Sequence, residues 1–281
     1  MRTLDELKSE VLELRRNAFI ETIMGLNNET YIVGYIGKTV PKEIFYGFNL
    51  IPLPLDGIDL HILKYSQEKG ICNIINSTLT YAITNKCPLI YNAKLIVTDN
   101  SCPMFSKILK ENLNEKIFVY ENLEDLKKKI KSVYNRTFDE KSFLNSVELS
   151  KKISAKLYEL SKTNIDSKFL YEVEFYTEFI FSLEKRLNLI DEILSKYKDV
   201  NNKRKIIYVP RAIQILDEID KNFKNYKIVE GCFCLGENFL EYKKFGYEFL
   251  KEKYGSKKEY TDILFKDCPY DKNKILKYRR N

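Results

Sequence analysis

The order of apolar and polar positions in the first part of the chain predicts short buried strands that alternate with helices. Continuous apolar runs rich in β-branched and aromatic residues are typical of buried strands, and apolar residues three or four positions apart are typical of helices. Strands are expected at residues 31–36, 50–55, 93–98 and 117–120. Helices are expected at residues 4–27, 42–48, 63–70, 77–85 and 104–112. This alternation is typical of an α/β domain with a mainly parallel sheet.

Glycine, asparagine and proline residues sharpen the boundaries of these elements. Gly37 directly follows the first strand and ends it, and Asn49 can stop the helix that comes next. Pro52 and Pro54 interrupt the second strand. Because proline has no N–H to donate to a ladder, this strand is expected at the edge of the sheet or at a strand end.

The pattern changes between residues 122 and 202, where glycine and proline are absent and apolar residues recur at helical spacing. Three or so helices are expected there, one around residues 143–157 and another from about 166 to 197. Beyond it, strands are expected at residues 206–209 and 226–229, with helices at 212–222 and 240–254. The predicted layout is an α/β domain at residues 1–122, a helical segment at 123–202 and a second, abbreviated α/β domain at 203–281.

Composition agrees with a folded, cytoplasmic protein. Of 281 residues, 44% are apolar and 31% are charged, which excludes a disordered or collagenous chain. No apolar run approaches the roughly 18 residues of a membrane-spanning helix, so no membrane association is expected. The first residues alternate charges with leucines and lack an apolar signal core, so secretion is not expected either.

The charge pattern favours a small acidic ligand over nucleic acid. The net charge is +7, but the two signs are interspersed, and the short basic clusters at 127–131 and 203–205 lie in helical or connecting sequence. No stripe of basic residues with a recognisable reading element is present, so nucleic-acid binding is not expected. A weak positive field suits an acidic ligand such as a coenzyme A ester. The single histidine, His61, excludes most histidine-based chemistry and is expected on the surface or in a helix.

The tripeptide Gly37-Lys38-Thr39 after an apolar strand invites interpretation as a phosphate-binding loop. The full motif needs a glycine five residues before Gly37, and Ile32 stands there. The loop therefore lacks the backbone freedom to fold around a phosphate, and this interpretation is rejected. No glycine-rich dinucleotide fingerprint and no G-x-S-x-G elbow are present.

The chain has six cysteines, which are Cys72, Cys87, Cys102, Cys232, Cys234 and Cys268. Disulfides are not expected in the cytoplasm, and a zinc site is not indicated because no C-x2-C pair exists and histidine ligands are missing. A buried, inert thiol is the ordinary interpretation of each cysteine taken singly. The three cysteines between residues 72 and 102, each near the end of a predicted element, keep a ligand role open as the alternative.

Several motifs occur together in the order seen in a known family. Residues 40–44 read V-P-K-E-I after a strand, and Pro52 follows in the next strand. Cys72 opens a C-x4-S-x-L pattern, and Cys102 follows the third strand. A stretch I-V-x4-C-x-G begins at Ile228. In these features residues 30–268 resemble the 2-hydroxyacyl-CoA dehydratase family, which includes benzoyl-CoA reductase subunits and double-cubane cluster proteins.

The resemblance implies a fold, a cofactor and a reaction. It implies two flavodoxin-like, doubly wound domains around a helical segment, the second domain being abbreviated. Cys72 and Cys102 match two family positions that bind an iron–sulfur cluster, [4Fe-4S], at the carboxyl edge of the sheets. Glu43 matches an acidic residue near the substrate. The implied reaction is one-electron reduction of an acyl-CoA thioester with elimination of water through a ketyl radical. A paralogous dehydratase subunit and an ATP-hydrolysing activator protein are the implied partners.

The sequence also departs from the family pattern. The family's third cluster ligand lies in a further C-terminal strand that has no equivalent here, so Cys232, Cys234 or Cys268 would have to substitute. Cys102 is followed by Pro103 where the family has aspartate. Glu43 can also be read as an ordinary first-turn helix carboxylate. Two functions are therefore kept open: an iron–sulfur subunit of a dehydratase or ATP-driven reductase, and a cluster-free partner or acyl-CoA-binding protein.

Overall fold

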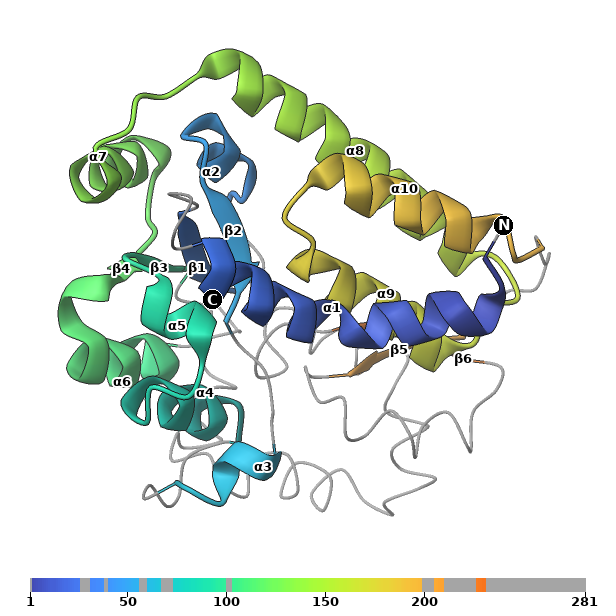
Figure 1. Cartoon of the computed structure of the whole chain (residues 1–281), viewed down its shortest axis with the longest axis horizontal. Coiled ribbons are helices and arrows are strands. Elements are labelled where there is room, and N and C mark those ends of the chain that lie inside the picture. Colours follow the sequence, from blue (N-terminus) through green and yellow to red (C-terminus); the bar gives the residue numbers. More distant parts are fainter. Residues whose placement is uncertain are drawn as a thin grey trace, which may run out of the picture.

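The computed structural model describes residues 2–25, 31–37, 40–55, 60–66, 73–99, 103–198, 205–209 and 226–230. Figure 1 shows strands flanked by helices, with α1 crossing in front of them and continuing toward the helices of the later part of the chain. The helices of the first part are α1 (Leu4–Gly25), α2 (Glu43–Gly47), α3 (Leu60–Leu63), α4 (Asn73–Ile83), α5 (Pro88–Asn92), α6 (Pro103–Leu113), the 3₁₀ turn η2 (Asn114–Lys116) and α7 (Leu123–Tyr134).

Four parallel strands form the central sheet, which confirms the predicted α/β class. They are β1 (Ile32–Ile36), β2 (Ile51–Pro54), β3 (Ile96–Thr98) and β4 (Ile117–Val119). Their spatial order is β2-β1-β3-β4, which agrees with a flavodoxin-like arrangement. β2 pairs with β1 alone among the described strands, so the two prolines lie on an edge strand as predicted.

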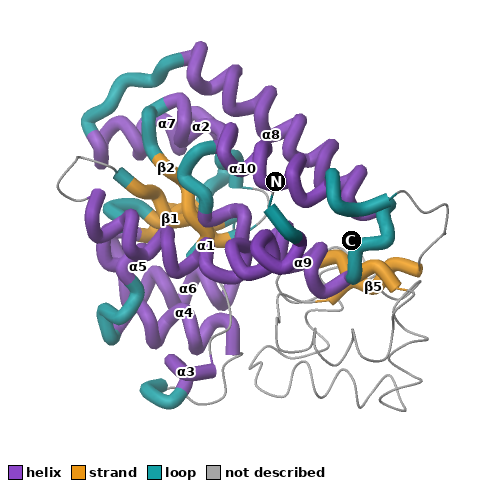
Figure 2. Tube along the Cα trace, turned by 45° about the vertical axis from the view of Figure 1, so that its right-hand side comes forward, coloured by secondary structure: helices purple, strands orange, loops and turns teal. Residues whose placement is uncertain are grey.

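Helices cover both faces of this sheet, because successive side chains of a strand point to opposite sides. Ile32 and Ile36 of β1 lie in a buried apolar cluster with residues of α1, α4, α5 and α6. Val33 and Tyr35 lie in a second cluster with residues of α2 and α7. Figure 2 shows α2 and α7 on one side of the strands, and α4, α5 and α6 on the other.

The predicted ends of β1 and α2 are confirmed by the backbone. Gly37 has a φ of +106°, and a Cβ built on it would lie 2.2 Å from the carboxylate of Asp99, just beyond β3. Asn49, with a φ of 53°, adopts the left-handed conformation just after α2. The positive φ of Gly37 turns the chain at the end of β1, and that of Asn49 turns it between α2 and β2.

Three helices and a 3₁₀ turn follow the sheet: α8 (Glu140–Ser161), α9 (Ser167–Tyr176), η3 (Thr177–Phe179) and α10 (Leu183–Leu194). The prediction of one helix from 166 to 197 is wrong. The backbone at Ile180 and Ser182 is extended, and the Ser182 hydroxyl accepts a 3.3 Å hydrogen bond from the Lys185 N–H, which begins α10 as a new helix. The apolar spacing continues through the break, so periodicity alone does not reveal it.

Two short helices differ from the sequence prediction. Of the helix expected at 63–70, residues 64–66 are not helical, and residues 67–70 lie outside the described residues. The helix observed here is α3, which ends at Leu63, and His61 is exposed on it. α5 was not predicted, because its five residues are too few to show helical periodicity. The other helices and strands of the first part lie within a few residues of the expected ranges.

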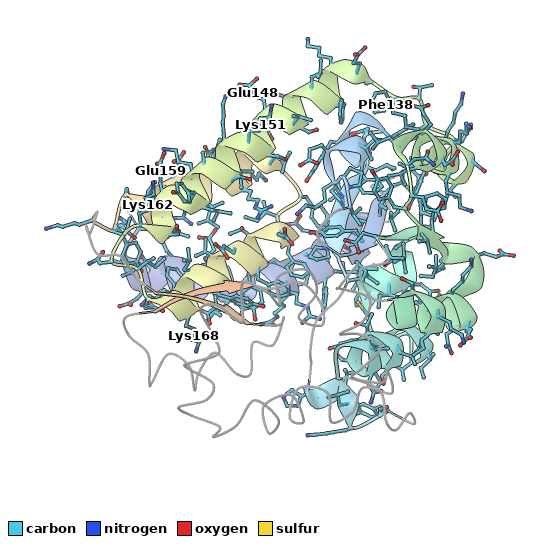
Figure 3. The ribbon with its side chains drawn as sticks, turned by 180° about the vertical axis from the view of Figure 1, so that it is seen from behind. Phe138, Glu148, Lys151, Glu159, Lys162 and Lys168 are labelled. Atoms are coloured by element: carbon cyan, nitrogen blue, oxygen red, sulfur yellow. The ribbon has the colours of Figure 1, made fainter. Side chains whose placement is uncertain are left out.

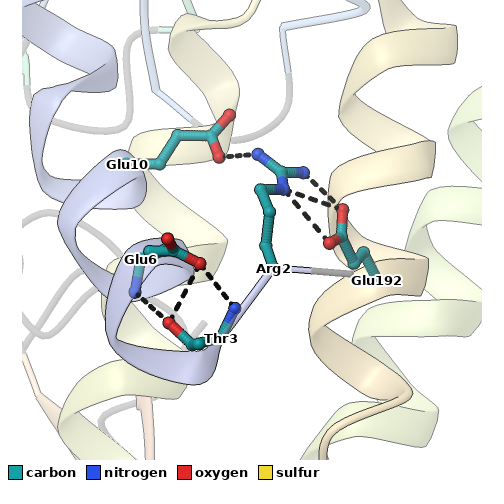
Figure 4. A network of polar contacts seen from close by, with 5 residues as sticks. All are labelled: Arg2, Thr3, Glu6, Glu10 and Glu192. Carbon is teal, nitrogen blue, oxygen red and sulfur yellow. Dashed lines mark hydrogen bonds and ion pairs between the residues drawn. The ribbon is translucent and has the colours of Figure 1, made fainter.

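The long helix α1 ties the sheet to the later helices. Thr3 and Glu6 form a reciprocal capping box at its start, since the Thr3 N–H donates to the Glu6 carboxylate at 2.7 Å and the Glu6 N–H donates to the Thr3 hydroxyl at 3.2 Å. Arg2 bridges Glu10 of α1 and Glu192 of α10 (Figure 4). α1 contacts both α5 beside the sheet and α9 beyond it.

β5 (Lys205–Val209) and β6 (Tyr226–Glu230) form a separate parallel pair, and β6 contacts α9. Both strands were predicted. The helices predicted at 212–222 and 240–254 lie outside the described residues, so the second α/β domain and the boundaries at 122 and 202 remain predictions. Among the described residues, no helix is both long and apolar enough to cross a membrane.

Candidate functional site

A cavity of about 330 Å³ lies between the sheet and the later helices. α2 and residues of β1 and β2 line one side of it, and α8, α9, η3 and α10 line the other. Its polar lining residues are Tyr35, Lys42, Glu43, Tyr46, Ser150, Ser154, Glu174, Glu178 and Arg186. In Figure 3, Glu148, Lys151 and Glu159 mark the exposed side of α8, and none of the three lines the cavity.

The short helix α2 presents its polar residues to this cavity. Glu43 and Tyr46 are three positions apart and share one face of the helix, while Ile44 and Phe45 are buried in the core beneath it. α2 also packs tightly against the start of α8. A Cβ built on Gly47 would lie 2.4 Å from the Phe138 ring, so glycine is needed at this contact.

A three-residue polar cluster joins the sheet to the later helices at the cavity wall. Lys42 Nζ lies 2.6 Å from Glu178 Oε1, and the Tyr35 hydroxyl donates to Glu178 Oε2 at 2.8 Å. The Lys42 ammonium also lies 5.2 Å from the centre of the Tyr35 ring. Both carboxylate oxygens of Glu178 are thus occupied, and the residue before Glu43 is held in place.

Arg186 reaches the cavity from the first turns of α10. Its Nε donates a 3.1 Å hydrogen bond to the hydroxyl of Thr177, which is fully buried and itself donates to the Val173 carbonyl at 2.7 Å. The terminal N–H groups of Arg186 meet no acceptor within the part of the chain that the structure describes. Arg186 is therefore oriented by the protein and retains donors for a ligand.

Tyr46 supplies a second donor. Burial raises the pKa of its hydroxyl well above its usual value, and the nearby carboxylates of Glu43 and Glu178 act in the same direction. The positive charge of Arg186 opposes this rise in the pKa. The hydroxyl is consequently protonated across the physiological pH range, and it can donate a hydrogen bond inside the cavity.

The structure tests only some of the residues singled out in the sequence. Glu43 lines the cavity; its catalytic role stays a prediction. Cys72, Cys102, Cys232, Cys234 and Cys268 lie outside the described residues. Cys87 is buried in the core, and burial raises the pKa of its thiol, so the expected burial is confirmed for this residue.

Tyr35, Lys42, Tyr46, Glu178 and Arg186 were not predicted as site residues. Tyr46 had a usable signal, since it lies one helical turn after Glu43. The sequence held no usable signal for Glu178 and Arg186, because both fall inside the segment predicted as one continuous helix.

Comparison with known families now identifies the chain's relatives. The family model of the 2-hydroxyglutaryl-CoA dehydratase D-component matches residues 39–232. The chain belongs to this family. The resemblance read from the sequence motifs is thereby confirmed, and the match begins just before α2 and includes every helix that lines the cavity. No curated protein matches the chain.

Membership of the dehydratase D-component family bears on the cofactor, since this is a cluster-binding class. Among the described residues no group of three or more histidine, cysteine or acidic side chains could hold a metal ion. Cys72 and Cys102 directly precede α4 and α6 in the sequence, and those two helices contact each other. The donor chemistry available at these positions, thiolate, is the one that iron–sulfur clusters use.

Proposed function

We propose that this chain is an iron–sulfur subunit of a dehydratase or related ATP-driven reductase that acts on an acyl-CoA ester. The observation that carries the proposal is that Glu43, in the family's motif, lines a cavity within the region matched by the family model. The cavity is the proposed site for the acyl group. An ATP-hydrolysing activator and a paralogous subunit are the proposed partners, and the cytoplasm is the proposed location.

Cys72 and Cys102 are the proposed cluster ligands, with Cys232 or Cys234, or a group from the paralogous subunit, completing the set. The contact between α4 and α6 supports this pairing, because each helix begins one residue after one of the cysteines. A helix N-terminus also lowers the pKa of a nearby thiol and so favours the thiolate that a cluster needs. A bound [4Fe-4S] cluster would supply single electrons to the acyl thioester.

The residues of the cavity act on the acyl group itself. The Glu43 carboxylate has no hydrogen-bond partner within the described part of the chain, so it is available to accept one from the substrate's 2-hydroxyl group. The Lys42–Glu178–Tyr35 cluster fixes the start of α2 and thereby the position of Glu43. When the Glu43 carboxyl group carries a proton, it can donate that proton to the hydroxyl, which then leaves as water.

The cluster proposal is tested by purifying the full chain without oxygen, alone and with its paralogue. We expect a brown protein that contains iron and acid-labile sulfide. Cys72→Ser and Cys102→Ser should abolish the colour, whereas the control Cys87→Ser should keep it, because Cys87 belongs to the core. A colourless, iron-free protein in both preparations would contradict the proposal; if it still binds acyl-CoA, it is the cluster-free alternative.

The role of Glu43 is tested by acyl-CoA binding with a matched control. Glu140 is also a first-turn carboxylate, at the start of α8, but it is exposed and does not line the cavity. We expect Glu43→Gln to weaken binding of a 2-hydroxyacyl-CoA about tenfold relative to the same acyl-CoA without the hydroxyl. Glu140→Gln should leave both affinities unchanged. If the two substitutions changed the affinities equally, Glu43 would be an ordinary helix-terminal charge with no role in binding the hydroxyl group.

A further inference from the structure

Two hydrogen-bond donors face the proposed acyl cavity from opposite sides. Tyr46 comes from α2 on the side of the sheet, and Arg186 comes from α10 on the side of the later helices. Within the described residues, the Tyr46 hydroxyl has no hydrogen-bond partner, and Arg186 uses only its Nε, toward Thr177. Donors left without protein acceptors in a partly buried cavity are costly unless a ligand or water receives them.

Both donors are held by their surroundings. The Thr177 hydroxyl, which receives Arg186 Nε, is fixed by its own bond to the Val173 carbonyl. Tyr46 is fixed by α2, which is anchored to α8 by the hydrogen bond that the Ser146 hydroxyl donates to the Glu43 carbonyl at 3.1 Å. Preorganised donors of this kind are the usual means by which a site stabilises negative charge on a substrate oxygen.

The charges around the cavity indicate which kind of oxygen fits there. Three carboxylates, of Glu43, Glu174 and Glu178, are set against two cations, Lys42 and Arg186. A ligand group with a full negative charge would therefore gain little from the long-range field. A neutral carbonyl oxygen accepts hydrogen bonds without that repulsion, and it gains from the donors most strongly as negative charge accumulates on it.

We propose that the Tyr46 hydroxyl and the Arg186 guanidinium donate hydrogen bonds to the carbonyl oxygen of the acyl thioester. This inference rests on the proposed acyl-CoA function and assigns two donor residues to it. Thr177 is a positioning residue, because it acts through Arg186. The pair polarises the carbonyl of the bound ligand and favours the state in which that oxygen carries extra negative charge.

The test compares butyryl-CoA with S-butyl-CoA, a thioether that lacks the carbonyl oxygen but keeps the chain and the coenzyme. The full chain, purified without oxygen, should bind butyryl-CoA about tenfold more tightly than the thioether. Tyr46→Phe and Arg186→Gln should each reduce this preference to about twofold or less. Thr177→Val should reduce it partly, and Arg186→Lys should restore part of what Arg186→Gln removes. The controls Tyr158→Phe and Arg16→Gln change exposed residues outside the cavity lining and should have no effect.

A spectroscopic measurement separates polarisation from a merely structural role. The carbonyl stretch of ¹³C-labelled butyryl-CoA should move to lower frequency on binding, and Tyr46→Phe and Arg186→Gln should each move it back toward the free value. Thermal melting checks that each variant folds. If Tyr46→Phe does not fold, Arg186→Gln and Thr177→Val still test whether the donors polarise the carbonyl. Equal binding of the ester and the thioether, with no shift of the stretch, would overturn this inference and leave acyl-CoA binding standing. Binding of neither compound would overturn the proposed function, and this inference with it.

Discussion

Glu178 joins two parts of the cavity wall. It lies 143 positions from Tyr35 and 136 from Lys42 in the sequence, yet it contacts both. Its side chain is only 16% exposed, and that of Lys42 is 31% exposed. A carboxylate at such a place is stabilised by its two partners, and removing its charge leaves Lys42 beside the cavity without a counter-ion.

Glu178→Gln should lower the free energy of unfolding by about 1–2 kcal/mol, because the amide keeps the bond from Tyr35 but loses the ion pair with Lys42. Chemical denaturation measures this. Glu159→Gln is the matched control, since Glu159 pairs with Lys156 on the exposed side of α8 and its loss should change stability little. A control effect as large as that of Glu178→Gln would contradict the role given to the buried pair.

Cys87 gives a prediction about pH. Burial raises the pKa of its thiol above the ordinary 9.0, so the neutral form is favoured in the folded chain. This contribution to stability is fully present below pH 9.0 and is lost as pH rises through the raised pKa of the folded state. At pH 8 iodoacetamide should leave Cys87 unmodified in the native protein and modify it after denaturation, as mass spectrometry of peptides would show. Modification of Cys87 at the same rate in both states would contradict its burial.

At the scale of elements, the break between η3 and α10 determines the site. If one helix ran from 166 to 197, as the sequence pattern predicts, Thr177 and Arg186 would lie nine residues apart along a straight rod. The extended residues Ile180 and Ser182 instead let Arg186 return to Thr177. Strands and long helices could be predicted because burial imposes a period, whereas this break depends on a capping serine within an uninterrupted apolar pattern.

Ser182→Ala should therefore affect both stability and the site. Loss of the cap should cost about 1 kcal/mol of unfolding free energy and should also weaken butyryl-CoA binding through Arg186. Ser195→Ala, at the C-cap of the same helix, removes only the side-chain bond to the Glu192 carbonyl and should change neither the affinity for butyryl-CoA nor the frequency of its carbonyl stretch. Calorimetric titration of both variants with butyryl-CoA measures the affinities. Equal affinities of Ser182→Ala and Ser195→Ala would contradict the link between the cap of α10 and the site.

At the scale of the whole molecule, the cavity that carries the proposal lies between a parallel sheet and a group of helices. The resemblance could single out Glu43, which lines this cavity, because its motif is local in sequence. It could not supply Tyr35, Glu178 or Arg186, whose contacts arise only when the later helices pack against α2. The family model extends over both sides of this cavity, so the proposed acyl site depends on the packing of the later helices against α2.

Hydrogen–deuterium exchange of the full chain with and without butyryl-CoA tests the location of the acyl site most directly. The account predicts slower exchange at residues 41–48, which contain α2, and at 177–187, which contain η3 and the start of α10. The exposed amides around Glu124 in α7, which has no residue in the cavity lining, serve as the internal reference and should not change. Binding of butyryl-CoA with no protection in either of the two segments would contradict the placement of the acyl group in this cavity.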